Sequence, residues 1–139
     1  MRKDLLYIDS NVFVYPLIYD PEAVGEAKKS KDFLLKIALG KVEAYTASVT
    51  WDEVVWVLRK VFDLELSVKE RKKFLNFPNL RLLGVKKSTV FRAEELMEKY
   101  RIRPRDAIHA AVALENKITT IVSYDKDFDD MNEVKRIEP

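Results

Sequence analysis

The chain has 139 residues, of which 47% are hydrophobic, 11% aromatic and 35% charged, at a formal net charge of +2. A length in this range fits one domain with a core of its own, covering residues 1–139, so a two-domain enzyme and a disordered chain are both excluded. The chain has no cysteine and one histidine, which excludes disulfides and thiolate chemistry and disfavours histidine-based metal sites, so any chemistry must depend on carboxylates.

The N-terminal segment predicts a buried strand that ends in a polar turn. The apolar run Leu5–Ile8 is continuous and is followed at once by Asp9, Ser10 and Asn11. This run is too short for a signal peptide or a membrane span. We therefore expect a cytoplasmic protein with no membrane partner.

The rest of the chain alternates predicted helices and strands. With Asp20 as a candidate N-cap, helical spacing runs from Pro21 to Gly40. Further helices are predicted over Ser48–Phe62, Ser67–Phe77, Ser88–Tyr100 and Pro104–Asn116. Further strands are predicted over Val42–Ala47, Leu80–Val85, Ile118–Ser123 and Val134–Ile137.

The order of these elements predicts the fold class. Nearly continuous apolar strands separated by one or two helices are typical of a parallel sheet with helices on both faces, the doubly wound α/β class. In such sheets ligands bind outside the carboxyl ends of the strands. Acids that directly follow a strand are therefore candidate site residues.

Three aspartates follow predicted strands. Asp9 comes directly after the first strand, and Asp125 and Asp127 come just after the fourth, where Phe128 is suited to anchor the loop in the core. Each aspartate also fits an ordinary role as a turn or N-cap residue. Their shared position at strand ends favours a common site.

Two further acids lie near the starts of predicted helices. Glu53 follows Thr50 by three residues, so a capping box would account for it. Asp106 lies in a first turn, where the helix dipole favours an anion. The dipole does not account for the small face that Asp106 shares with Ala110 and Ala113, which lets the helix approach the sheet. Because buried acids are costly unless paired or metal-bound, and oxygen donors suit Mg²⁺ or Mn²⁺, a divalent-metal site is predicted.

The acidic segments, in this order, resemble the PIN-domain ribonucleases, and most closely the VapC-type toxins of prokaryotic toxin–antitoxin pairs. The segments that carry the resemblance are Tyr-Ile-Asp9-Ser-Asn-Val, Thr-Trp-Asp-Glu53-Val-Val, Arg-Asp106-Ala-Ile-His-Ala-Ala and Ser-Tyr-Asp125-Lys-Asp127-Phe. The resemblance covers essentially the whole chain. It implies a three-layer α/β/α sandwich with a parallel sheet of about four or five strands, often as a homodimer.

The resemblance and the chemistry of carboxylates together predict a Mg²⁺- or Mn²⁺-dependent endoribonuclease that hydrolyses RNA phosphodiester bonds. The resemblance implies a toxin with a small VapB-like antitoxin as its partner. Catalysis and metal binding are assigned to Asp9, Glu53, Asp106 and Asp125, with Asp127 as an alternative or additional metal ligand. Supporting roles are assigned to Ser10, Asn11 and Ser123, and RNA binding to Arg101, Arg103 and Arg105.

The distribution of charge also favours a polyanionic partner. Lysine and arginine outnumber acids between Arg59 and Arg105, whereas acids are in excess elsewhere. The stretch Lys69–Lys73 equally fits a solvated helix face. His109 is expected to be a packed structural histidine. Core packing is the main expectation, and contact with the antitoxin the alternative, for the apolar residues Val12, Phe13, Tyr15, Trp51 and Trp56.

Three other functions stay open at this point. A housekeeping RNA-processing nuclease of the same family has the same acids, and a non-catalytic RNA- or partner-binding module has the same fold. A phosphotransfer protein also places aspartates at strand ends. A phosphatase of that kind requires Asp-x-Asp after the first strand, where this chain has Asp9-Ser10-Asn11, and a receiver domain requires an aspartate near Leu83–Lys86, where there is none.

Overall fold

Within residues 4–139, which the computed structural model describes, five strands form one sheet. The strands are β1 (Leu5–Ile8), β2 (Glu43–Ala47), β3 (Leu80–Leu83), β4 (Thr120–Val122) and β5 (Lys135–Ile137). Their order across the sheet is β3-β2-β1-β4-β5, and every neighbouring pair is parallel. The predicted α/β class with a parallel sheet is thus confirmed.

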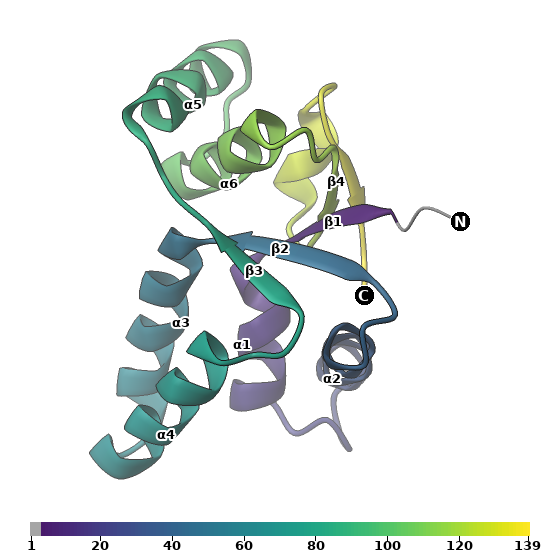
Figure 1. Ribbon diagram of the computed structural model, residues 1–139, viewed down its shortest axis with the longest axis vertical. Coiled ribbons are helices and arrows are strands. Elements are labelled where there is room, and N and C mark those ends of the chain that lie inside the picture. The colour runs from purple at the N-terminus through teal and green to yellow at the C-terminus, as the bar shows by residue number, and fades with distance from the viewer. Residues whose placement is uncertain (1–3) are drawn as a thin grey trace.

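Helices cover both faces of this sheet (Figure 1). The helices are α1 (Ser10–Ile18), α2 (Gly25–Ala38), α3 (Ser48–Val61), α4 (Leu64–Leu75), α5 (Lys87–Lys99), α6 (Pro104–Glu115) and the 3₁₀ helix η1 (Lys126–Asp130). Helices α1 to α4 lie on one side of the sheet and α5 and α6 on the other, which gives the predicted three layers. Within the described range 4–139, no helix combines the length and apolar character needed to cross a bilayer.

The buried core lies in the two spaces between the sheet and its helical layers. Because side chains alternate along a strand, Leu6 and Ile8 of β1 pack toward α1 to α4, whereas Tyr7 packs toward α6. On α6, Ala110 and Ala113 are fully buried, as expected for a helix whose small side chains let it lie close to the sheet. This close approach brings the first turn of α6 to the carboxyl edge of the strands.

Helix α1 was not predicted, and the interpretation of Ser10 and Asn11 as a polar turn is wrong. Asp9 caps this helix, since its side chain accepts a hydrogen bond from the backbone N–H of Ser10 at 2.8 Å. The helix is apolar over most of its length and contains Pro16. It therefore lacks the periodic polar face by which helices are identified in sequence.

Helix α2 begins at Gly25, four positions later than predicted from Pro21. Asp20 does not cap the helix. Its carboxylate instead accepts a hydrogen bond from the backbone N–H of Glu22 at 2.9 Å, which closes a turn before the helix starts.

Helix α4 begins at Leu64, three positions earlier than predicted from Ser67. Asp63 is its N-cap, and the carboxylate of Asp63 accepts from the backbone N–H of Leu66 at 2.8 Å. The prediction missed this cap because the helix follows α3 with almost no connecting loop.

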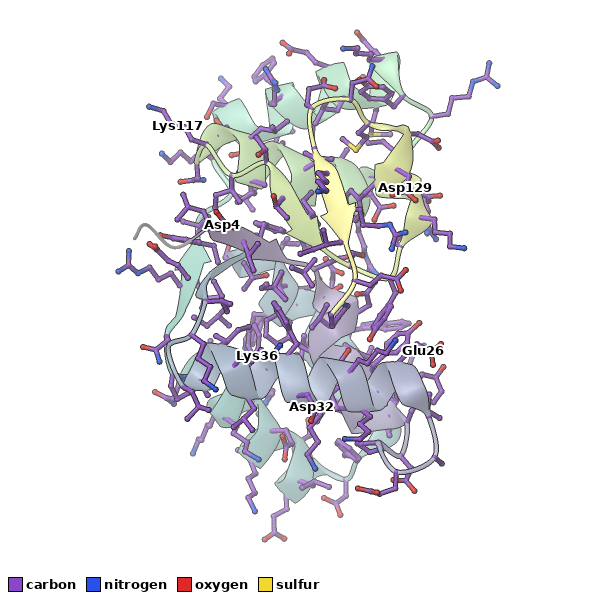
Figure 2. All side chains as sticks on the ribbon, turned by 90° about the vertical axis from the view of Figure 1, so that its right-hand side faces the viewer. Asp4, Glu26, Asp32, Lys36, Lys117 and Asp129 are labelled. Carbon is purple, nitrogen blue, oxygen red and sulfur yellow. The ribbon has the colours of Figure 1, made fainter. Side chains whose placement is uncertain are left out.

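The last strand is held in place by an arginine. Arg136 on β5 donates to the carboxylate of Asp129 on η1, at 2.9 Å from Nε, and to the backbone carbonyl of Ser123 at 3.0 Å. Figure 2 shows Asp129 beside this edge of the molecule. Arg136 therefore fixes the loop between β4 and β5 at its start and in η1.

The apolar residues near the predicted site divide into two groups. Val12 and Phe13 are buried in the core, as expected, and Tyr15 is half-buried. The expected core packing of Trp51 and Trp56 is wrong, because their exposed fractions are 38% and 54%. Both tryptophans lie on the outer side of α3.

Candidate active site

The carboxyl ends of β1 and β4 meet at one edge of the sheet, and Asp9 lies there with only 5% of its surface exposed. Its Oδ2 accepts hydrogen bonds from Ser123 Oγ at 2.6 Å and from Asn11 Nδ2 at 3.3 Å. Its Oδ1 accepts from the backbone N–H of Ser10. The structure therefore places the predicted supporting residues around Asp9, where they orient its carboxylate.

Glu53 reaches the same edge from α3. Its Oε2 accepts a hydrogen bond from Ser10 Oγ at 2.5 Å, and its Oε1 lies 2.7 Å from His109 Nε2. The capping-box interpretation of Glu53 is wrong, because α3 begins at Ser48 and the hydroxyl of Thr50 pairs with Thr46 at 2.7 Å. The side chain of Glu53 instead lies in the acidic cluster.

The hydrogen bonds that Glu53 accepts also favour its ionised form. Burial alone would raise the pKa of the Glu53 carboxyl. Hydrogen bonds from His109 and Ser10 and the charges of His109 and Arg105 outweigh burial, so that the pKa of Glu53 is lowered. Glu53 is thus a carboxylate at neutral pH.

His109 was expected to be a packed structural histidine, and it is buried, with 1% of its surface exposed. Its ring also contacts the acidic cluster, which the prediction missed. Nδ1 lies 2.5 Å from the hydroxyl of Tyr7, and Nε2 lies 3.5 Å from Oδ1 of Asp9 in addition to its bond to Glu53. The signal in the sequence is spacing, because His109 follows Asp106 by three positions on a helix and Tyr7 precedes Asp9 by two on a strand.

Three further aspartates form the second part of the cluster. Asp106 lies in the first turn of α6, and Asp125 and Asp127 lie at the start of η1, where Asp125 accepts from the backbone N–H of Asp127 at 2.9 Å. One carboxylate oxygen of each lies within 4.8 Å of the other two. The backbone N–H of Asp125 also donates to Ser123 Oγ at 2.9 Å, which joins this group to Asp9.

Asp106 is the acid of this cluster that has a buried carboxylate oxygen without a hydrogen bond among the described residues. This oxygen is Oδ2. Burial and the charges of Asp125 and Asp9 raise the pKa of Asp106 to about 7. Within residues 4–139, the negative charge gathered here thus exceeds what the neighbouring cationic side chains neutralise.

Arg103 is the cation that the structure places against the acids. Its Nη2 lies 3.2 Å from Asp125 and 3.4 Å from Asp127, and its Nε lies 3.7 Å from Asp106. With 73% of its side chain exposed, Arg103 is also open to solvent. Of the other arginines assigned to RNA, Arg101 and Arg105 are exposed, and Arg105 lies near enough to Glu53 to contribute to lowering its pKa.

The donor set fits a hard divalent cation. Asp9 and Glu53 with His109, and Asp106 with Asp125 and Asp127, are two groups of side chains whose ligand atoms lie close enough together to hold a metal ion. The buried Oδ2 of Asp106 without a hydrogen-bond partner is the feature that a cation would compensate. Carboxylate oxygens are the ligands of Mg²⁺ and Mn²⁺.

The chain is similar to one sequence family and to several known proteins. A model of the PIN domain family matches residues 6–134. Ribonuclease VapC2 from Methanocaldococcus jannaschii is 24% identical over 143 residues, which cover 99% of this chain and 96% of the relative.

Two solved structures share the fold at low sequence identity. VapBC2 from Rickettsia felis, bound to a DNA fragment from its promoter, has a TM-score of 0.74 and 16% identity, with 96% of this chain and 98% of that chain covered. VapC20 from Mycobacterium tuberculosis, a toxin that cleaves the sarcin–ricin loop, has a TM-score of 0.72 and 15% identity, with 96% and 99% covered. The likeness extends over almost the whole length of each chain.

Proposed function

The chain belongs to the PIN domain family, as its acidic motifs predicted, and from this premise we propose that it is a divalent-metal-dependent endoribonuclease that hydrolyses RNA phosphodiester bonds. The observation that carries the proposal is the convergence of Asp9, Glu53, Asp106 and Asp125 from four separate segments on one edge of the sheet. The similarity to a ribonuclease over nearly the whole chain supports it.

The four acids would hold Mg²⁺ or Mn²⁺. A bound divalent ion would neutralise charge on the phosphodiester and activate water for attack on phosphorus. Of Asp125 and Asp127, Asp125 is the better candidate for direct contact, because it interacts with Asp106 and its side chain is 20% exposed, against 47% for Asp127. Asp127 is the outer acid in this proposal.

The raised pKa of Asp106 would also make cation binding depend on pH. Because its pKa is about 7, its carboxyl group holds a proton in a large part of the molecules at neutral pH when no cation is bound. A divalent cation held by Asp106 would displace this proton, so that cation binding would become stronger as the pH rises. Hydrogen bonds orient the side chains of both Asp9 and Glu53.

The RNA backbone would meet the arginines at and before the start of α6. The guanidinium of Arg103 pairs with acids that a divalent cation would neutralise, and its exposure leaves it accessible to a phosphate. Arg101 and Arg105 are exposed beside it. These three side chains would place the backbone next to the carboxylates by charge and without reading the base sequence.

The proposal includes a small VapB-like antitoxin as partner and a homodimer of the chain. Its support is the similarity to VapBC structures. Arg103 pairs with Asp125 and Asp127, which are the acids that a basic side chain of an antitoxin would meet. Purification of the chain with its neighbouring gene product tests the partner, since a housekeeping nuclease would come without one. Light scattering tests the dimer.

The proposed activity is tested with a labelled single-stranded RNA. The wild-type chain should cleave it with Mg²⁺ or Mn²⁺, and Asp9→Asn or Glu53→Gln should lower the rate about 100-fold or more. Asp32→Asn is the matched control, because Asp32 is an exposed acid on α2 (Figure 2) and pairs with Lys28 at 3.3 Å. Equal rates for Asp9→Asn and the control would contradict the proposal.

A further inference from the structure

We infer that Tyr7 and His109 form a buried pair that positions Glu53. This inference rests on the proposed function, since Glu53 is there a metal ligand. Tyr7 lies on β1, His109 on α6 and Glu53 on α3, and Nδ1 and Nε2 of the imidazole ring lie at 2.5 Å and 2.7 Å from Tyr7 and Glu53. Through the contact between His109 and Glu53, the pair connects α6 on one side of the sheet with α3 on the other.

Burial makes this pair unusual. Tyr7 has 0% and His109 has 1% of its surface exposed, and the two rings meet edge to face with centroids 5.6 Å apart. Polar groups in such a setting are costly unless each hydrogen bond is made. An apolar side chain would fill the same space beneath α6, so packing alone does not account for an imidazole at this position.

The chemistry of the groups fixes which atom donates. The carboxylate of Glu53 has only acceptor oxygens, so Nε2 of His109 must carry the hydrogen and donate to Oε1. Nδ1 then faces the hydroxyl of Tyr7, which can donate to a neutral ring or accept from a charged one. In either charge state the ring presents the same N–H group to Glu53.

This arrangement limits what His109 can do and fixes Glu53. Because Nε2 holds a hydrogen, it has no lone pair for a metal, so His109 is a positioning residue and not a ligand. Glu53 is a long side chain from a separate helix, and its two oxygens are held by Ser10 and His109. Outer partners of this kind orient ligand carboxylates and hold them ready for a cation.

The test measures Mn²⁺ affinity by calorimetry in a double-mutant cycle of His109 and Glu53. We expect His109→Leu to weaken Mn²⁺ binding about 10–100-fold, the usual effect of removing an outer partner of a ligand. His109→Gln retains an N–H donor and should recover part of that loss. In a Glu53→Gln background, His109→Leu should cause no further loss beyond about twofold, because the group that it positions is already changed.

Tyr7→Phe tests the other end of the pair with minimal change in packing. We expect a few-fold weaker Mn²⁺ affinity and a lower cleavage rate with an unchanged KM. Tyr45→Phe is the matched control, because Tyr45 is paired with Tyr7 on the neighbouring strand and its hydroxyl donates to Glu43 instead. The control should leave Mn²⁺ affinity unchanged.

Several outcomes would overturn the inference. One is unchanged Mn²⁺ affinity in a folded His109→Leu chain, and another is an equal loss with and without Glu53→Gln, which would mean that His109 acts independently of Glu53. If His109→Leu does not fold, wild-type Mn²⁺ affinity in Tyr7→Phe would overturn it. If the wild-type chain binds Mn²⁺ with the expected coupling but cleaves no RNA, the proposed function fails and the positioning of Glu53 stands.

Discussion

The side-chain hydroxyl of Ser123 donates a hydrogen bond of 2.6 Å to Oδ2 of Asp9. These residues follow the neighbouring parallel strands β4 and β1. The same hydroxyl accepts from the backbone N–H of Asp125 at 2.9 Å. One serine thus joins two strand ends to the loop that carries further acids, so the orientation of Asp9 depends on correct formation of the sheet.

Substitution of Ser123 should therefore affect both stability and metal binding. We expect Ser123→Ala to lower the free energy of unfolding by about 1–2 kcal/mol, because buried partners lose a hydrogen bond. Mn²⁺ affinity should fall about tenfold, because Asp9 loses its orienting donor. Urea denaturation and calorimetry measure the two effects.

The control is Ser67→Ala. Ser67 is also buried, but its hydroxyl has no hydrogen-bond partner within residues 4–139. This variant should be as stable as wild type or slightly more so, with unchanged Mn²⁺ affinity. The account of Asp9 would be wrong if both serine variants bound Mn²⁺ like wild type.

Asp106→Asn distinguishes a metal ligand from a residue that only complements the helix dipole. The metal-free variant should be at least as stable as wild type, because the substitution removes a charge repelled by Asp125 and Asp9. The rise in Tm on adding Mn²⁺ should shrink. A dipole role alone predicts the opposite, a loss of about 0.3–1 kcal/mol that does not depend on metal.

The stability of the metal-free chain should depend on pH in a defined direction. The pKa of Asp106 is raised from 3.8 to about 7, so in this interval the folded state holds a proton that the unfolded state releases, and stability falls as the pH rises. The pKa of His109 is also raised, despite burial, by its contact with Glu53 and the charges of Asp9, Glu53 and Asp106. The stabilisation by His109 is present below pH 6.5 and, like that by Asp106, is lost as the pH rises.

Glu53 affects the stability of the fold in the opposite direction. Its pKa is lowered from 4.5, so the stabilisation that it contributes is lost as the pH falls. Metal-free stability should therefore be highest near about pH 4.5 and should fall from there toward pH 7. With saturating Mn²⁺ the slope in this range should reverse, because protons compete with the cation. Thermal melts from pH 4 to 8, with EDTA and with Mn²⁺, measure both curves, and parallel curves would argue against the metal site.

Arg103→Gln tests the arginine that pairs with the acids. Because Arg103 competes with a divalent cation for the acids, its removal should leave Mn²⁺ binding as tight as in wild type or tighter. RNA binding should weaken, and the salt dependence of RNA binding should fall by about one phosphate contact. Filter binding at several salt concentrations measures this. Lys28→Gln, which removes an exposed lysine paired with Asp32 on α2, is the matched control. Identical salt slopes in the two variants would remove Arg103 from the RNA site.

The convergence of the acids could be predicted because strand ends determine it. Asp9 and Asp125 follow neighbouring parallel strands, and the small face of α6 brings Asp106 close to them. The partners of Glu53 could not be predicted, because a capping box with Thr50 satisfies the same local pattern. The choice between these arrangements depends on where α3 lies relative to α1, which carries Ser10, and to α6, which carries His109, and this is a tertiary property.

His109 and Arg103 show the same limit. Each lies three positions from Asp106, one after it and one before it, so the helix places both near the acid. Sequence spacing does not tell whether the imidazole turns toward the core or toward the carboxylates, and it does not tell that a flexible arginine folds back on Asp125. The buried hydroxyl of Tyr7 and the three aspartates that pair with Arg103 decide these orientations.

The dependence of RNA cleavage on Mn²⁺ concentration tests the central claim most directly. We expect no cleavage in EDTA and a rate that rises with Mn²⁺ to saturation, with its midpoint at the Kd measured by calorimetry on the same protein. In Asp9→Asn both the rate and the calorimetric binding should be lost together. Cleavage by the purified wild-type chain that continues at full rate in EDTA would contradict the claim that these carboxylates form a metal-dependent ribonuclease site.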